Sequence, residues 1–264
     1  MRLYWEVARA TARRMSTYRT AALAGTFTNT VFGFLLAFVM VAVFRERRDI
    51  GGFDSLDAVT LVFVGQGLYP LTMGSITQAE IADRIKSGEV AVDLSRPYDF
   101  QSWWAAVAAG RAFHLGLSRG VVPVVAGGIV MGLRWPDSVG VWVLFLVSVG
   151  LAAAVSFAWG FLLQLCAFWI LDVRGPYQIG WLAAQFLSGL HVPVVVFPDH
   201  LEAIVRALPF VALVQLPGEL FLGKHSGLAA VGVLLVQVGW LVVLVLAGRL
   251  VLARAVRRVV VHGG

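Results

Sequence analysis

The sequence has little charge and a single cysteine. Only 14% of its 264 residues are Asp, Glu, Lys or Arg, and 59% are hydrophobic, with a mean hydropathy of +0.83. A soluble domain carries about a quarter charged residues, so this composition excludes a water-soluble fold. The lone Cys166 excludes an internal disulfide. The longest polar stretch, about Glu80–Trp104, is too short for a separate soluble core, so residues 1–264 are predicted to form one transmembrane domain.

The sequence also lacks the usual signatures of catalysis and metal binding. Its five histidines have no ligand spacing, and His191 and His200, near Asp199 and Glu202, form only a loose group in an expected solvated loop. The segment Gly218–Lys224 fits G-x-x-x-x-G-K but lacks the Ser or Thr that would hold Mg²⁺. We therefore expect no catalytic, cofactor-binding or metal-binding residues in this chain.

Long apolar runs dominate what is present. A bilayer core of about 30 Å requires about 20 helical residues, and six runs satisfy this requirement. The third is the weakest, because Arg119 interrupts it. The predicted spans are Ala21–Phe44, Ala58–Ala79, Ala112–Leu133, Val139–Leu171, Tyr177–Phe197 and Gly227–Ala247.

The distribution of positive charge predicts the orientation. Six spans place both termini on one side, together with fifteen of the 21 lysines and arginines. Because positive residues concentrate on the cytoplasmic side, both termini are predicted to be cytoplasmic. The arginines flank apolar runs, which is typical of membrane topology and not of nucleic-acid binding.

The first 19 residues are predicted to form a helix that lies on the membrane surface. Six mainly apolar residues share one helical sector, and Arg2, Glu6, Arg9 and Arg13 occupy the opposite one. The alternative is a solvated, disordered tail. The apolar sector contains Met1, Tyr4, Trp5, Ala8, Ala12 and Met15.

The predicted spans contain few ionisable groups. The first, fourth and sixth have none except the thiol of Cys166, the second has only Tyr69, the third has His114 and Arg119, and the fifth has Tyr177 and His191 near its ends. Secondary transporters usually carry charged residues near the middle of the membrane. If the protein is a transporter, its energy is therefore expected to come from outside the chain.

The stretch of residues 80–104 is the candidate entry point for that energy. A short amphipathic helix is expected at its start, with Ile81, Ala82 and Ile85 on one face and charged residues on the other. Gly88 can end this helix, and Pro97 prevents regular helix after Arg96. Such a helix on a cytoplasmic loop can dock on a soluble partner; an ordinary solvated loop is the alternative.

Two segments resemble signatures of a known family. Residues Gly88-Glu89 and Asp93-Leu94-Ser95-Arg96-Pro97 resemble the GE-x-x-x-DLLRP signature of ABC-2 type transporter permeases, with Ser95 in place of a leucine. Phe197-Pro198, Leu208-Pro209-Phe210 and Pro217 resemble the same family's P-x-x-FFP…LPF…P stretch, with Val196 in place of its first phenylalanine. The resemblance is strongest to six-span bacterial exporters of the viologen- and daunorubicin-export type.

This resemblance implies an all-α (type V) exporter fold with an N-terminal interface helix at 1–19, a cytoplasmic coupling loop at 80–104 and an extracytoplasmic re-entrant region at 198–226. It also implies two separate ATP-binding subunits, which hold ATP and Mg²⁺, a second permease half that is identical or paralogous, and a bacterial plasma membrane. The implied coupling residues are Glu80, Asp83, Arg84, Lys86, Gly88, Glu89, Asp93, Leu94, Arg96 and Pro97, and the implied re-entrant motif is Phe197, Pro198, Pro209, Phe210 and Pro217. The cargo would be hydrophobic or amphipathic; an ion-coupled transporter and a non-transporting scaffold are the rival interpretations.

The charge of this loop leads to a first prediction. Reversing two charges, in the double variant Asp83→Lys/Glu89→Lys, is expected to uncouple ATP hydrolysis from transport while the protein still inserts into the membrane. Hydrolysis and transport measured on the same reconstituted sample test this. Wild-type coupling in the double variant would refute the assignment of this loop.

Overall fold

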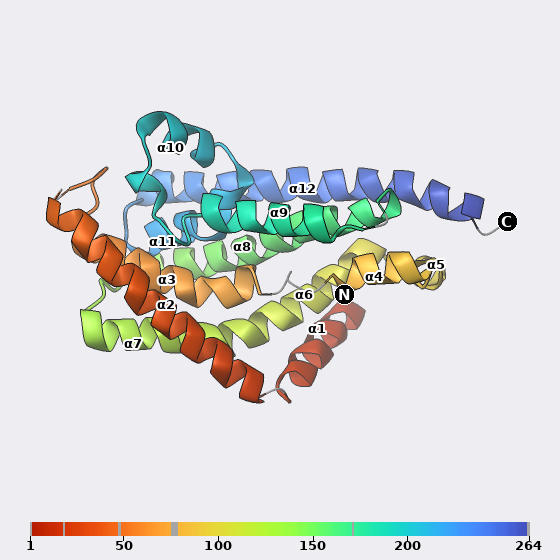
Figure 1. Ribbon diagram of the computed structural model, residues 1–264, viewed down its shortest axis with the longest axis horizontal. Coiled ribbons are helices and arrows are strands. Elements are labelled where there is room, and N and C mark those ends of the chain that lie inside the picture. Colours follow the sequence, from red (N-terminus) through yellow and green to blue (C-terminus); the bar gives the residue numbers. More distant parts are fainter. Residues whose placement is uncertain (1, 18, 47–48, 75–78, 171, 263–264) are drawn as a thin grey trace.

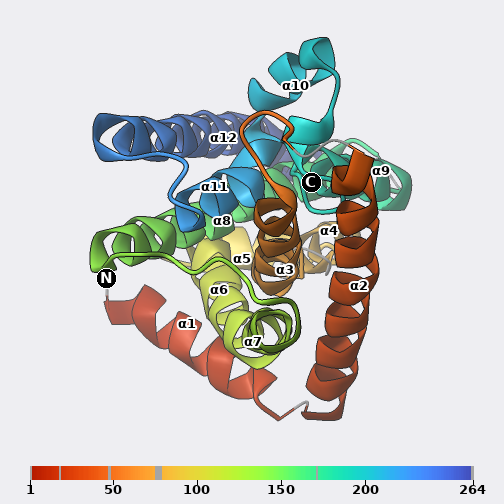
Figure 2. The same cartoon turned by 90° about the vertical axis from the view of Figure 1, so that its left-hand side faces the viewer.

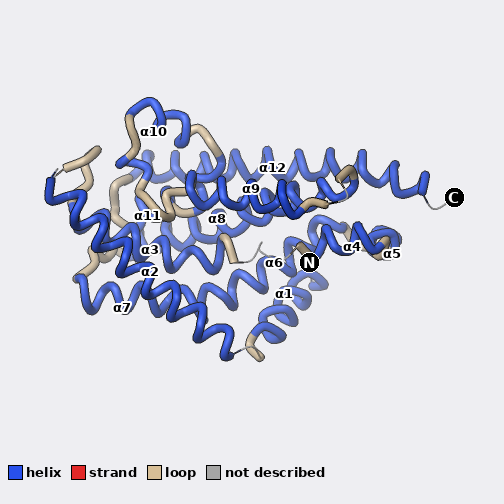
Figure 3. The backbone as a smooth tube through the Cα atoms, viewed as in Figure 1, coloured by secondary structure: helices blue, strands red, loops and turns tan. Residues whose placement is uncertain are grey.

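The computed structural model describes residues 2–17, 19–46, 49–74, 79–170 and 172–262, which form helices and no strands (Figure 3). Met1, Leu171 and residues 75–78 of the second predicted span, all of which the sequence analysis assigned, lie outside these ranges. The helices are α1 Arg2–Met15, α2 Arg19–Glu46, α3 Ser55–Thr72, α4 Glu80–Ser87, α5 Val90–Ser95, α6 Phe100–Leu115, α7 Val121–Met131, α8 Val139–Leu165, α9 Arg174–Leu187, α10 Asp199–Arg206, α11 Gln215–Phe221 and α12 Gly227–His262. The short segments are η1 Gly116–Gly120, a π turn, and the 3₁₀ turns η2 Cys166–Phe168, η3 Val194–Val196 and η4 Pro209–Leu213.

Four helical stretches of the described chain are long and apolar enough to cross a membrane: Ala22–Glu46, Phe100–Met131, Val139–Phe168 and Gly227–Arg257. They correspond to the first, third, fourth and sixth predicted spans. The all-α membrane fold is thus confirmed. Lipid-compatible spans of this kind are helical because each backbone N–H and C=O is satisfied within its own helix.

The boundaries of the other two predicted spans need correction. The second, Ala58–Ala79, is α3, which ends at Thr72. The fifth, Tyr177–Phe197, is α9, which has only 14 residues and ends at Leu187. Gly189 follows with φ of +83°, and Pro193 lacks an N–H, so the helix does not continue. At 1.5 Å per residue α9 is roughly 21 Å long, shorter than the bilayer core.

Two further predicted boundaries are wrong because polar and charged residues lower the local hydropathy of turns that are helical in the structure. The third span was predicted to begin at Ala112, but its helix begins at Phe100, so Phe100–Trp104 belong to α6 and the predicted loop 80–104 ends at Asp99. The last helix continues past Ala247 to His262. At the interruption predicted around Arg119, the chain forms the π turn η1 and remains helical.

The bundle has two distinct ends (Figure 1). α4, α5 and the last turns of α12 lie at one end, on the right, and α10 and the last turn of α2 lie at the other. α1 and α2 meet at an angle and enclose α6 and α7 between them (Figure 2). α1 packs on α6, α2 on α3, and α8 on α12 and α11.

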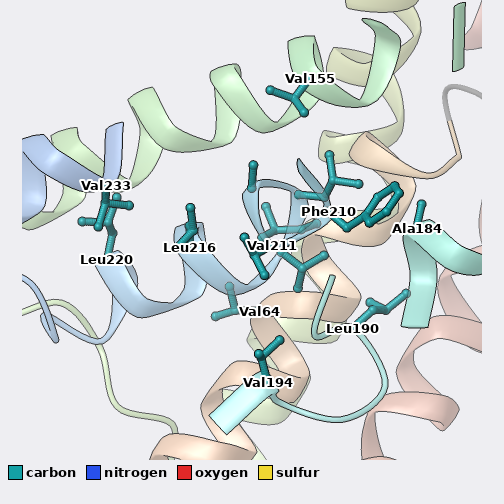
Figure 4. Packing of buried hydrophobic residues seen from close by; sticks show 14 of the residues in the cluster. Val64, Val155, Ala184, Leu190, Val194, Phe210, Val211, Leu216, Leu220 and Val233 are labelled. Atoms are coloured by element: carbon teal, nitrogen blue, oxygen red, sulfur yellow. The ribbon is translucent and has the colours of Figure 1, made fainter. Parts of the chain in front are cut away.

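The largest core surrounds η4 and α11. Every residue of α11 is buried, and Phe210, Val211 and Leu216 pack among Val64 of α3 and Val155 of α8 (Figure 4). The resemblance implied a re-entrant region at 198–226. The burial of α11 shows that this region turns back into the bundle and does not lie flat on its surface.

The turn η1 and the helix α3 cross in close contact at two glycines, Gly120 and Gly67. A Cβ atom on Gly120 of η1 would lie 2.3 Å from the carbonyl oxygen of Gly67 on α3. Backbone atoms cannot move aside as a flexible side chain can, so this crossing requires glycine. By contrast, a Cβ on Gly239 of α12 would meet no atom within 4 Å.

The crossing yields a stability prediction. Gly120→Ala is expected to destabilise the protein by about 1–3 kcal/mol, because the added methyl overpacks the α3–η1 contact. Gly239→Ala, a matched control, is expected to leave stability unchanged or raise it slightly. Thermal unfolding of the two detergent-purified variants and wild type tests this, and equal melting temperatures for all three would contradict it.

Candidate functional site

The candidate site is the α4–α5 elbow, defined as residues Glu80–Pro97. It projects at the end of the bundle that also carries the last turns of α12 (Figure 1). Gly88 separates the two helices with φ of +80°, a conformation that favours glycine. Arg96, held extended by the following Pro97, ends α5. Both helix breaks predicted from the sequence are therefore confirmed.

A buried hydrogen bond attaches the elbow to α8. The N–H of Ile81 donates to Oε1 of Gln164 at 2.9 Å. This N–H lies in the first turn of α4, where helical N–H groups have no partner within the helix. Ile81 and Ala82 are buried, as their predicted shared face requires, and Gln164 is buried with them. The contact therefore fixes the start of α4 against the end of α8.

An ion pair attaches the same helix turn to α6. Nη2 of Arg111 lies 3.0 Å from both carboxylate oxygens of Glu80. The Arg111 side chain is 10% exposed and that of Glu80 is 43% exposed, so the pair lies at the edge of the bundle, and both carboxylate oxygens accept from the guanidinium. α4 is thus held at its first turn by two different transmembrane helices.

A second ion pair closes the elbow. Nη1 of Arg84 on α4 lies 2.8 Å from the carboxylate of Asp93 on α5 and 3.5 Å from that of Glu89. Asp93 is buried, and the Arg84 guanidinium also stands 5.9 Å from the centre of the Trp104 ring. Beneath the pair, Val90 packs in an apolar cluster with residues of α6 and α8. The two short helices therefore behave as one unit.

Asp99 ties the end of the elbow to α12. Its carboxylate accepts hydrogen bonds from the N–H and hydroxyl of Ser102 and lies 3.6 Å from Arg249. Burial alone would raise the pKa of Asp99, but these hydrogen bonds and the charge of Arg249 hold it below its ordinary value. The carboxylate is therefore charged at neutral pH.

The predicted coupling residues fall into two groups. Glu80, Arg84, Asp93 and Leu94 face the bundle and hold the elbow together. The others are exposed: Asp83, Lys86, Gly88, Glu89, Arg96 and Pro97. Among these, Asp83 and Lys86 line a pocket beside α9, and Lys86 lies 3.8 Å from Asp172. The contact of these exposed residues with a partner stays a prediction.

Val92 is a candidate that the sequence reasoning missed. It is 58% exposed on the outer side of α5, between the charged residues of the elbow. Val90, two positions earlier, is buried. A helix over residues 90–95 places these two valines on opposite faces. A helix predicted over these residues would therefore have indicated that Val92 is exposed.

The second predicted motif is spread over the chain and does not form one site. Phe197 and Pro198 precede α10, and Pro209 begins η4. Phe210 is buried edge-on against Trp159, and Pro217 is buried inside α11. Pro209, Phe210 and Pro217 therefore belong to the core, whereas Pro198 is exposed at the start of α10.

Two buried carboxylates at the opposite end were also missed. Asp57 is 1% exposed and lies 2.5 Å from Arg134 and 2.6 Å from Lys224. Glu219 is 2% exposed and lies 2.9 Å from Arg206 and 2.8 Å from His225. Burial alone would raise the pKa of Glu219, but His225 and Arg206 hold it below its ordinary value. The first cluster joins the start of α3 to the loops that hold Arg134 and Lys224, and the second joins α11 to α10 and to His225.

Residues of the G-x-x-x-x-G-K match and of the loose histidine group take part in these ion-pair clusters. Lys224, the lysine of the G-x-x-x-x-G-K match, is bound to Asp57 and to the carbonyl oxygen of Gly52. Glu202, near the loose histidine group, pairs with Arg206. Within the described ranges, no three His, Cys, Asp or Glu residues are grouped to hold a metal ion.

Comparison with known families identifies the class of protein. A family model described as ABC-2 family transporter protein matches residues 29–263, and the chain belongs to this family. A search of curated proteins finds no match. The chain is therefore a multi-pass membrane permease of an ABC transporter, the transport subunit that associates with an ABC ATP-binding subunit.

The ion pair inside the elbow yields a prediction. Asp93→Asn leaves Arg84 without its buried carboxylate and is expected to loosen α5 by about 1.5–3 kcal/mol. Asp83→Asn, at an exposed position of the same elbow, is the control. Limited chymotrypsin digestion tests this at Tyr98, which follows α5. Asp93→Asn should be cut faster than both wild type and the control, and equal rates in all three would contradict the role given to the pair.

Proposed function

We propose that the protein is one permease half of an exporter that moves a hydrophobic or amphipathic compound out of the cytoplasm. Two copies of a separate subunit bind ATP with Mg²⁺ and hydrolyse it. The observation that carries this proposal is the elbow, which is fixed to α6 and α8 on one side and carries exposed charged and apolar residues on the other.

The apolar spans favour an external source of energy. α8 contains no charged residue at all, and α2 has none between Arg19 and Arg45. In α12 the first charged residue is Arg249, beyond the predicted membrane core. An ion-coupled transporter needs titratable groups along its path. An ATP-driven mechanism needs only a mechanical connection to a subunit outside the membrane.

The contacts of the elbow suggest how that connection operates. When the ATP-binding subunits close on ATP, they would push the elbow through its exposed side. The Glu80–Arg111 and Ile81–Gln164 contacts would pass the movement to α6 and α8. Because α8 packs along α11 and α12, a shift of α8 would also move the buried segment at the opposite end.

The location and assembly follow from the same arrangement. The elbow lies at the end that carries the last turns of α12, so we place it, with both termini, in the cytoplasm of a bacterial cell whose plasma membrane the bundle spans (Figure 1). A second permease half, identical or paralogous, would complete the pathway. The re-entrant region would then face the outside, with α10 at its tip.

The interface tests the proposal most simply. Val92→Arg is expected to reduce capture of the ATP-binding subunit by at least about tenfold, because it replaces the exposed apolar side chain of α5 with a bulky charged one. Leu201→Arg, at an exposed apolar position on α10 at the other end, is the control and should capture the subunit normally. Affinity purification in mild detergent from the native host, followed by mass spectrometry, measures both.

The same preparation separates the rival functions. ATP should drive a lipophilic rhodamine dye into inside-out vesicles, and Val92→Arg should abolish this uptake. Uptake that persists without ATP and collapses with a protonophore would indicate an ion-coupled transporter. Normal subunit capture by Val92→Arg would reject the elbow as the docking site, and capture without any ATP-dependent uptake would indicate a scaffold.

A further inference from the structure

The contact between α1 and α6 contains a groove that the transport cycle described above does not use. The helices approach each other closely at Gly110, where an added Cβ atom would lie 2.1 Å from the carbonyl oxygen of Ala8. Around this point alanines on both helices, among them Ala12 and Ala109, leave a groove of about 1110 Å³. This exceeds the roughly 300–1,000 Å³ of typical ligand pockets.

The wall of the groove is apolar and open to the membrane. Trp5, Phe113 and Leu117 line it and are each more than half exposed. The helix that contains α6, Phe100–Met131, has 32 residues and a length of about 48 Å, well beyond the bilayer core of about 30 Å. Since α1 covers the elbow-side part of this helix, the groove reaches from the headgroup level into the acyl region.

The rim of the groove is positively charged. Arg9 and Arg13 of α1 both line it. Neither has an acidic side chain within ion-pair distance in the described part of the chain. Guanidinium groups bind phosphate oxygens with charge-assisted, often paired hydrogen bonds. An apolar channel beneath two unpaired arginines is complementary to a molecule with a phosphate at one end and a hydrocarbon chain at the other.

We infer that this groove binds one anionic phospholipid of the adjacent leaflet. Its phosphate lies between Arg9 and Arg13, and an acyl chain runs along α6 past Ala109 toward Phe113. The bound lipid holds α1 against α6, next to the elbow that α6 helps to anchor. The inference is independent of the direction of transport and of the cargo.

Native mass spectrometry of the full-length protein tests this inference. Protein extracted from vesicles of phosphatidylcholine and phosphatidylglycerol is delipidated stepwise, and the retained lipids are identified. Wild type is expected to keep one phosphatidylglycerol after the other lipids are lost. Arg9→Gln/Arg13→Gln should weaken this retention about tenfold. Arg254→Gln/Arg257→Gln on α12 removes the same charge from two exposed positions and should retain the lipid as wild type does.

A second variant tests the groove itself. Ala109→Trp keeps every arginine but fills the channel, and it should also lose the bound lipid. If Arg254→Gln/Arg257→Gln weakens lipid retention as much as Arg9→Gln/Arg13→Gln does, the lipid is held by general charge attraction and the proposed site is wrong. Equal retention of phosphatidylcholine by wild type, or wild-type retention by Ala109→Trp, would overturn it as well. If Arg9→Gln/Arg13→Gln does not fold, Arg13→Gln alone and Ala109→Trp decide the outcome.

Discussion

The double attachment of α4 is the constraint on which the rest of the proposed mechanism depends. A helix of eight residues has little stability of its own, because the first turn is costly to form. α4 is stable here because its first turn bonds to Gln164 and Arg111, on two transmembrane helices, while Ile81 and Ala82 enter the core. A force applied to the elbow therefore reaches α6 and α8 together, and neither helix can shift without moving the elbow.

Both ends of the bundle combine buried ion pairs with exposed charged residues. At the α10 end, Asp57 and Glu219 are buried and paired with cations, while Asp199 on α10 is exposed. At the elbow end, the buried Asp93 serves the internal structure, and Glu89, Arg96 and Val92 remain exposed. Arg9 and Arg13 line the groove between α1 and α6. The surface proposed for the subunit and the groove proposed for the lipid therefore both adjoin α6.

The sequence predicted the long apolar helices well and the short ones poorly. α2, α8 and α12 follow from uninterrupted apolar runs. The start of α6 was missed because Arg111 lowers local hydropathy, although the structure satisfies this charge with Glu80. α9 was predicted too long because hydropathy does not register the turn at Gly189. The pairing of Asp57 with Lys224, across 167 residues, depends on tertiary packing that no local pattern encodes. Gly88 and Pro97 located the elbow in the sequence. Which of its residues contact α6 and α8 and which are exposed could be seen only in the structure.

Site-specific cross-linking tests the central claim most directly. The chain has one cysteine, so a Cys166→Ala background allows a single cysteine to be placed at Val92 on the elbow or, as a control, at Leu201 on α10. In native membranes treated with a short bifunctional reagent, position 92 is expected to cross-link to the ATP-binding subunit, and position 201 is not. A cross-link from position 201 and none from position 92, in protein of normal abundance, would contradict the account.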